Sequence, residues 1–176
     1  TVKAALIGFP THEDGGNCVS EIIANGIVPA GMEIMDKALI EATDNFSKAG
    51  YPRDVELLLI VELDGTVSEV DELINKVSEI SKKNNSSTIK ISKNEKERLS
   101  FWIGRKAAFP ACGAMAPDYY CMDGSIPRGK LAEALKEINK LSKKYNLSVA
   151  NCFHAGDGNL HPLIMFDGSK KDELRK

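Results

Sequence analysis

The sequence NCFHAGDGNLHP, residues 151–162, holds two of the chain's three histidines. Apolar, strand-like runs precede and follow it. Its two glycines permit positive φ, while Asp157 and Asn159 favour turns through local side-chain hydrogen bonds. The stretch therefore predicts a β-hairpin whose connection is residues 156–159.

In that register, Ala155 lies opposite Leu160 and His154 opposite His161. Directly opposed residues point to the same face, with Cβ atoms about 4.5–5.5 Å apart, so the two imidazoles can converge on one metal ion. From spacing alone, a metal or catalytic role and a polar turn flanked by histidines by chance both stay open. A metal usually needs a third protein ligand, and Asp157 lies in the turn, off the histidine face.

Composition narrows the class of protein. The 176 residues fit one domain, and a net charge of −2 without a basic cluster gives no sign of a nucleic-acid partner. The apolar runs are too short to span a bilayer. Four cysteines without C-x-x-C spacing favour reduced thiols in a cytoplasmic protein.

The order of the elements indicates an α+β fold. Strands are expected at residues 2–9, 27–35, 55–63, 88–91 and 119–122, and helices over residues 13–25 and after Asp36, Thr66, Asn94 and Pro127. The near-continuous apolar run 55–63 predicts a central strand covered on both faces. Some connections are too short for parallel crossovers. We therefore expect duplicated ferredoxin-like βαβ units that form an antiparallel sheet with helices on one face.

Both ends of the chain suggest a piece of a longer polypeptide. It begins within a predicted strand and without methionine, and its last residues, 170–176, are a charged run typical of a helix start. A truncated domain exposes apolar surface, so self-association into a homo-oligomer is also expected.

Four separate stretches, residues 27–36, 102–111, 117–127 and 153–162, resemble the FAD-linked oxidase C-terminal domain. The glycolate oxidase FAD subunit and D-lactate and D-2-hydroxyglutarate dehydrogenases share this family. The resemblance implies that residues 1–176 are the substrate and cap domain of a flavoenzyme that oxidises a small 2-hydroxy acid to the 2-oxo acid. It also implies that FAD is held mainly by an N-terminal domain, in agreement with the lack of a dinucleotide-type glycine fingerprint here.

The resemblance carries four residues over. His154 and His161 match metal-binding histidines, with zinc, manganese and iron as candidate metals; the metal would hold the substrate and lower the pKa of its hydroxyl. Arg105 matches a clamp for the substrate carboxylate, a task that suits a guanidinium; otherwise it is an exposed helix arginine. Asn159 either contacts the flavin, orients a histidine or serves the turn.

Two departures from the family pattern shape the prediction. Phe109 and Cys121 stand where some relatives carry a threonine and a lysine for a dicarboxylate, which favours a monocarboxylate such as glycolate or lactate. The family's glutamate ligand and histidine base belong to a Gly-Glu-His-Gly stretch that is absent from residues 1–176. We therefore expect no catalytic base in this chain, and no turnover by it alone.

Two other interpretations of the sequence stay open. One is a non-enzymatic α+β module that binds a metal or ligand or mediates assembly; the other is a stand-alone metallohydrolase, which lacks a third ligand. The flavoenzyme reading predicts the FAD domain of the same polypeptide and electron-transfer subunits as partners. It places the protein in the cytoplasm, or at a membrane through those subunits.

Overall fold

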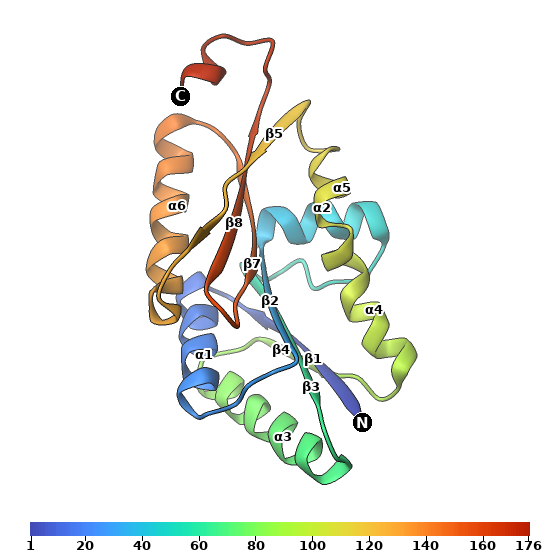
Figure 1. Cartoon of the computed structure of the whole chain (residues 1–176). Coiled ribbons are helices and arrows are strands. Elements are labelled where there is room, and N and C mark those ends of the chain that lie inside the picture. Colours follow the sequence, from blue (N-terminus) through green and yellow to red (C-terminus); the bar gives the residue numbers. More distant parts are fainter.

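A computed structural model describes all residues 1–176, and its centre is one eight-stranded sheet (Figure 1). The strands are β1 (Val2–Phe9), β2 (Gly31–Asp36), β3 (Leu57–Asp64), β4 (Thr88–Ile91), β5 (Asp118–Cys121), β6 (Gly124–Ser125), β7 (Val149–His154) and β8 (Asn159–Phe166). Their order is β4-β1-β3-β2-β7-β8-β5, with β6 paired to β8. Every pairing is antiparallel, as the sequence predicted.

Six α-helices accompany the sheet. They are α1 (His12–Ala24), α2 (Lys37–Ser47), α3 (Val67–Lys83), α4 (Glu95–Lys106), α5 (Ala108–Cys112) and α6 (Leu131–Tyr145), with 3-10 turns at Arg128–Lys130 and Glu173–Arg175. Thr11, Asp36, Thr66 and Asn94 each accept a backbone N–H of the helix that follows. Each cap satisfies a donor that the first helical turn leaves free. The helix starts predicted after Asp36, Thr66 and Asn94 are confirmed. No helix is both long and apolar enough to cross a membrane.

The chain is built from two related units. In the first, β1-α1-β2 and β3-α3-β4 give the ferredoxin-like strand order β4-β1-β3-β2. In the second, β5-α6-β7-β8 repeats the path of β1-α1-β2-β3, with β8 between β7 and β5. The units join where β2 pairs with β7. The expected duplication of βαβ units is confirmed.

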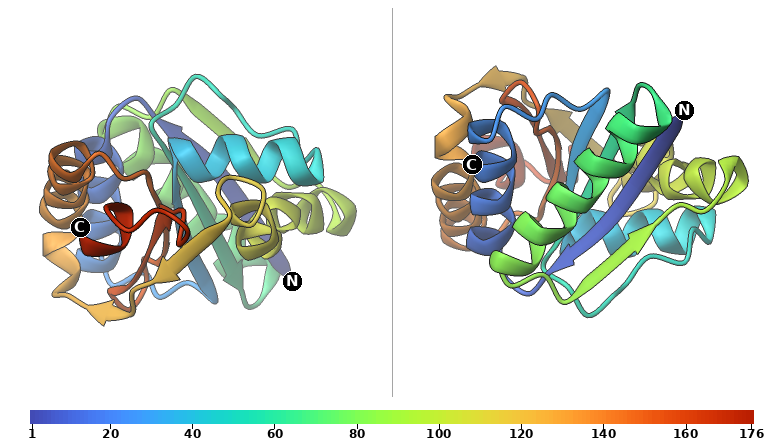
Figure 2. Two further views of the ribbon diagram at one scale, coloured as in Figure 1. Left: turned by 90° about the horizontal axis from the view of Figure 1, so that it is seen from above. Right: turned by 90° about the horizontal axis from the view of Figure 1, so that it is seen from below.

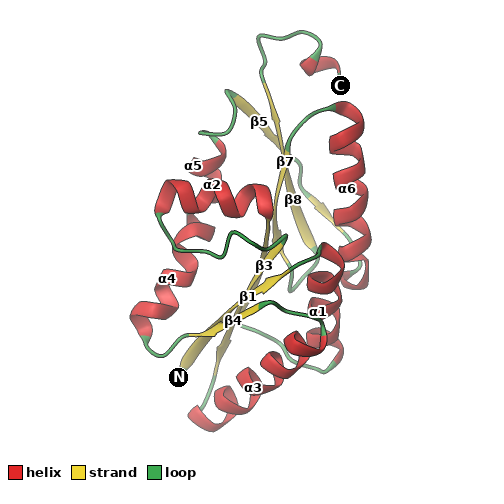
Figure 3. Cartoon of the chain, turned by 180° about the vertical axis from the view of Figure 1, so that it is seen from behind, coloured by secondary structure: helices red, strands yellow, loops and turns green.

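The expectation of helices on one face only is wrong. One core cluster unites α1, α3 and α6 with one face of the sheet, and a second unites α2, α4 and α5 with the other. Figures 2 and 3 show these two helical layers. The reason lies in β3, where Leu57 to Val61 are all fully buried. Because successive strand residues point to opposite faces, such a run needs apolar cover on both.

Asp36 makes the stability of the fold depend on pH. It is 6% exposed and accepts hydrogen bonds from Leu39 N and from Asn151 Nδ2, the latter at 2.6 Å. Burial raises its pKa above the ordinary 3.8, although these hydrogen bonds and nearby His12 oppose the shift. Around this pKa the folded state therefore binds more protons than the unfolded state. The contribution of Asp36 to the free energy of unfolding is complete below about pH 3.8 and is lost as pH rises through the pKa of the folded state.

Asp36→Asn is expected to remove this dependence. The new amide can donate to Asn151 Oδ1, a buried acceptor without a partner. Urea unfolding at pH 4 and pH 7 measures the effect. Relative to the native protein, the variant should have a more favourable free energy of unfolding at pH 7 than at pH 4. An equal stability difference at both pH values would contradict the role of Asp36.

Candidate functional site

The histidine hairpin forms, but with a different register from the one predicted. Its connection is residues 155–158, so His154 lies opposite Asn159, and Cys152 opposite His161. The turn closes early because Gly158 adopts a φ of +81° and its N–H reaches His154 O. The shift amounts to two residues, which keeps every side chain on its face. Both histidines therefore still share one face, as diagonal rather than direct neighbours.

The two imidazoles lie against each other. Their ring centroids are 5.1 Å apart and the rings are nearly perpendicular, at 86°. The His154 side chain is 41% exposed and that of His161 18%. Asp123 Oδ1 lies 3.4 Å from His161 Nε2, but its side chain is 73% exposed, so screening by water weakens this contact.

Glu33 on β2 connects the histidines to the first unit. Its Oε1 lies 2.6 Å from His154 Nδ1, and its Oε2 accepts from Arg105 Nε at 3.0 Å and pairs with Arg105 Nη2 at 2.9 Å. The side chains of Glu33 and Arg105 are only 12% and 13% exposed. Glu33 is not among the site residues predicted from the sequence. The sequence did hold a signal, since Glu33 is the one charged residue in the strand predicted over residues 27–35.

Arg105 is thus neither an exposed helix residue nor a free cation. Two of its nitrogens are committed to Glu33, which leaves the Nη1 side of the guanidinium for a further acceptor. Its proposed role toward a substrate carboxylate stays a prediction, now with a definite geometric basis.

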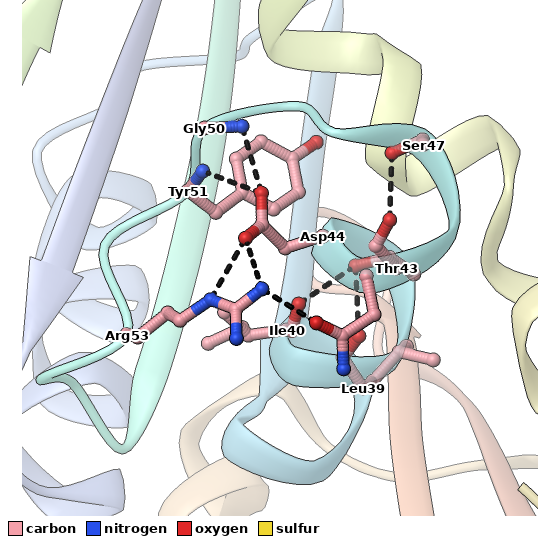
Figure 4. Close-up of polar contacts among 9 residues, drawn as sticks. Leu39, Ile40, Thr43, Asp44, Ser47, Gly50, Tyr51 and Arg53 are labelled. Atoms are coloured by element: carbon pink, nitrogen blue, oxygen red, sulfur yellow. Dashed lines mark hydrogen bonds and ion pairs between the residues drawn. The ribbon is translucent and has the colours of Figure 1, made fainter.

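Asp44, on α2, holds the loop that follows this helix (Figure 4). Asp44 Oδ1 accepts from the backbone N–H groups of Gly50 and Tyr51, and its Oδ2 from Arg53 Nε and Nη2 at 2.8 and 2.6 Å. Burial opposes ionisation of Asp44, but these donors outweigh it and lower its pKa. The carboxylate thus holds the loop that carries Tyr51.

Tyr51 in turn holds α4. Its hydroxyl donates to Phe101 O at 2.5 Å and accepts from Arg105 N at 3.2 Å. Burial raises the pKa of Tyr51 to about 12, so the phenol keeps its proton at neutral pH. Gly104 permits the close approach, because a Cβ there would lie 2.2 Å from the ring.

Tyr51→Phe is expected to lower the free energy of unfolding by about 1–2 kcal/mol, because two hydrogen bonds of a buried hydroxyl are lost. Chemical denaturation measures the change. Tyr119→Phe is the matched control, since the Tyr119 hydroxyl makes no hydrogen bond within the chain; it should stay within about 0.5 kcal/mol of the native protein. Equal effects of the two substitutions would contradict the role given to Tyr51.

Asn159 has a buried side-chain oxygen without a partner. The turn is closed instead by Asp157, whose Oδ1 accepts from Asn159 N at 2.9 Å. Asn159 begins β8 opposite His154, and its Oδ1 is shielded from solvent without a donor. Buried polar atoms are rarely left unpaired, so this oxygen suits a donor from outside the chain.

The side chains do not form a complete metal-binding cluster. No three His, Cys, Asp or Glu side chains come together in a geometry that holds a metal ion. Cys152 lies opposite His161, but burial raises the pKa of its thiol to about 12, which disfavours a thiolate ligand. The structure provides two neighbouring imidazoles, one of them oriented by a carboxylate.

The chain belongs to the FAD linked oxidases, C-terminal domain family, whose model matches residues 1–176. It is 48% identical to the glycolate oxidase subunit GlcD of Escherichia coli over 99% of this chain and 35% of that protein. It is 31% identical to GlcD of Bacillus subtilis and 30% identical to a mitochondrial D-lactate dehydrogenase of Arabidopsis thaliana, covering 37% and 30% of them. The chain thus spans about a third of the length of these relatives.

Solved structures agree on the fold. A 4-ethylphenol oxidase from Gulosibacter chungangensis superposes with a TM-score of 0.66 over 99% of this chain and 42% of that one, at 12% identity. A p-cresol methylhydroxylase gives the same TM-score at 13% identity, over 99% of this chain and 41% of that one. At such low identity these likenesses bear on the fold alone.

Proposed function

We propose that residues 1–176 are the substrate and cap domain of a flavin-dependent dehydrogenase that oxidises a small 2-hydroxy acid, such as glycolate or D-lactate, to the 2-oxo acid. The names of the relatives support an enzyme over a non-enzymatic binding module. The observation that carries the proposal is the convergence of His154 and His161 with Glu33 and Arg105 at the junction of the two units.

Glu33 sets the direction in which His154 acts. An ionised carboxylate only accepts hydrogen bonds, so His154 Nδ1 carries the shared hydrogen. With that hydrogen on Nδ1, Nε2 is the ring nitrogen left for a second partner. A carboxylate behind a histidine in this way orients the ring and raises its basicity as a ligand. His154 Nε2 is thus prepared to bind a metal ion or a polar hydrogen.

His154 and His161 would together hold a divalent metal, with a third ligand from outside residues 1–176. Such a metal acts as a Lewis acid on a bound hydroxyl. Imidazole ligands favour zinc and iron, whereas manganese prefers oxygen ligands. Zinc and iron are therefore the metals we expect first.

Arg105 supplies the charge that a 2-hydroxy acid requires. Its Nη1 side is free to bind the substrate carboxylate, while Glu33 holds the other side in place. Phe109 and Cys121 are both exposed, and neither offers a cation to a second carboxylate. This favours a monocarboxylate.

We place the cofactor next to Asn159, whose unpartnered Oδ1 suits a donor group of a flavin. Bound FAD supplies a two-electron acceptor for oxidation of the substrate carbon. We assign most of the FAD site and the catalytic base to other parts of a longer polypeptide. Electron-transfer subunits are its proposed partners in the cytoplasm or at a membrane surface.

Steady-state kinetics of the full-length protein with glycolate and D-lactate tests the proposal. His154→Ala and His161→Ala should each lower kcat/KM by about 100-fold or more and reduce bound metal. His12→Gln is the control, because His12 is the one histidine outside the site. Unchanged turnover in both site variants, or equal losses in the control, would contradict the assignment.

A further inference from the structure

An apolar groove lies on the second unit, on the face of β8 opposite to that of His161. It runs between α6 and the strands β8 and β5 and has a volume of about 590 Å³. Its walls include Tyr120 on β5, Leu141 on α6 and Ile164 on β8, and Leu174 of the C-terminal turn lies at one end. Tyr120 is 63% exposed, Leu141 51% and Leu174 58%. Large apolar side chains gathered in one exposed patch mark a surface that is normally covered.

The first unit shows what covers the equivalent surface. There α3 packs beside α1 on β1 and β3, and buries Val70, Ile74 and Val77 against the sheet. Under the correspondence of the units, β5 takes the place of β1, β8 of β3 and α6 of α1. The groove between α6, β8 and β5 is therefore the position that α3 occupies in the first unit.

The sequence repeats at the point where that helix begins. Asp64-Gly65-Thr66 links β3 to α3, and Asp167-Gly168-Ser169 follows β8 in the same way. Thr66 and Glu69 form a capping box at the start of α3. Ser169 and Asp172 have the same spacing, which is a signal for a helix start. The next residues already turn, since Leu174 N donates to Lys170 O at 3.3 Å.

We propose that this groove seats an amphipathic helix that starts after Ser169 and is supplied by the continuation of the same polypeptide. The helix is the second unit's counterpart of α3 and presents a stripe of apolar residues at helical spacing to Tyr120, Leu141 and Ile164. The chain spans 35% of the length of its Escherichia coli relative, so a protein of that length has ample sequence to form it. This inference does not depend on the proposed activity.

Hydrogen exchange and hydroxyl-radical labelling of the full-length protein test the proposal. The backbone that follows Ser169 should exchange at least 100-fold more slowly than an unstructured peptide. Tyr120 and Met122 should be labelled several-fold less than in residues 1–176 alone, whereas exposed Phe46 on α2 should be labelled equally in both.

Ile164→Asp then tests whether protection of the segment after Ser169 depends on its binding in the groove. A buried carboxylate in the groove floor is expected to release the segment, raising its exchange rates while the rest of the sheet stays protected. Val28→Asp, at a residue 88% exposed, is the control and should change nothing. Rapid exchange after Ser169 in the native protein, or slow exchange that survives Ile164→Asp, would overturn the proposal. So would groove protection that appears only at high protein concentration, which would assign the groove to a second copy of the chain.

Discussion

Glu33→Ala is expected to lower the free energy of unfolding by about 3–5 kcal/mol, because it leaves the guanidinium of Arg105 nearly buried without its counter-ion. Arg105 is 13% exposed, so water cannot replace the two lost contacts at 3.0 and 2.9 Å. His154 loses its partner at the same time. The effect should therefore exceed that of any single surface ion pair in this protein.

The chain offers a matched control. Lys37 Nζ and Glu56 Oε1 are also 2.9 Å apart, but their side chains are 44% and 45% exposed. Glu56→Ala should therefore cost less than about 1 kcal/mol. Urea denaturation of both variants gives the comparison. In a double-mutant cycle, the variant that carries both Glu33→Leu and Arg105→Met should recover much of the lost free energy of unfolding, because well-packed apolar residues can replace a buried ion pair. Similar costs at Glu33 and Glu56 would refute the argument from burial.

Gly158→Ala should destabilise the histidine hairpin by about 3 kcal/mol. Its φ of +81° is costly for any residue with a Cβ, by about 1–2 kcal/mol. The added Cβ would also lie 2.3 Å from Ile126 O, a backbone atom that cannot rotate away. Since Ile126 N donates to Gly158 O at 3.0 Å, the clash should detach the β6 segment from the hairpin.

Gly156, two residues earlier in the same turn, provides the comparison. Its φ is not positive, and a Cβ there would meet only Met32 Cβ, at an ordinary 3.7 Å. Gly156→Ala should therefore stay within about 0.5 kcal/mol of the native protein. Thermal unfolding and the histidine NMR signals report the two effects. If both substitutions shift stability alike, the strain at Gly158 is not the cause.

Local chemistry explains which parts of the fold the sequence predicted well. The caps at Asp36, Thr66 and Asn94 depend on residues three positions apart, so the sequence shows each of them directly. The strand at residues 55–63 was recognised from its unbroken apolar run. The helices after Asp36 and Asn94 were predicted, but their place on the second face of the sheet was not. That same run requires cover there, yet no local pattern says which helix covers which face.

The candidate site was predicted in part for the same reason. His154 and His161 belong to one hairpin, so their shared face follows from the two-residue period of strands, even with the register shifted. Glu33 is 121 positions from His154, and Arg105 is 72 from Glu33. The pairing of β2 with β7 brings Glu33 to His154, and the packing of α4 brings Arg105 to Glu33. No local pattern in the sequence indicates either contact.

That pairing is short, since β2 and β7 share only three residue pairs: Glu33 with His154, Ile34 with Phe153 and Met35 with Cys152. The two apolar pairs alone would tolerate other alignments. Since six residue pairs with β3 hold β2 in place, a slip of β7 by one residue would carry His154 to the opposite, apolar face and leave Glu33 without this partner. Glu33 thus favours one alignment of the two units. The contact that orients His154 also selects the register in which β7 pairs with β2.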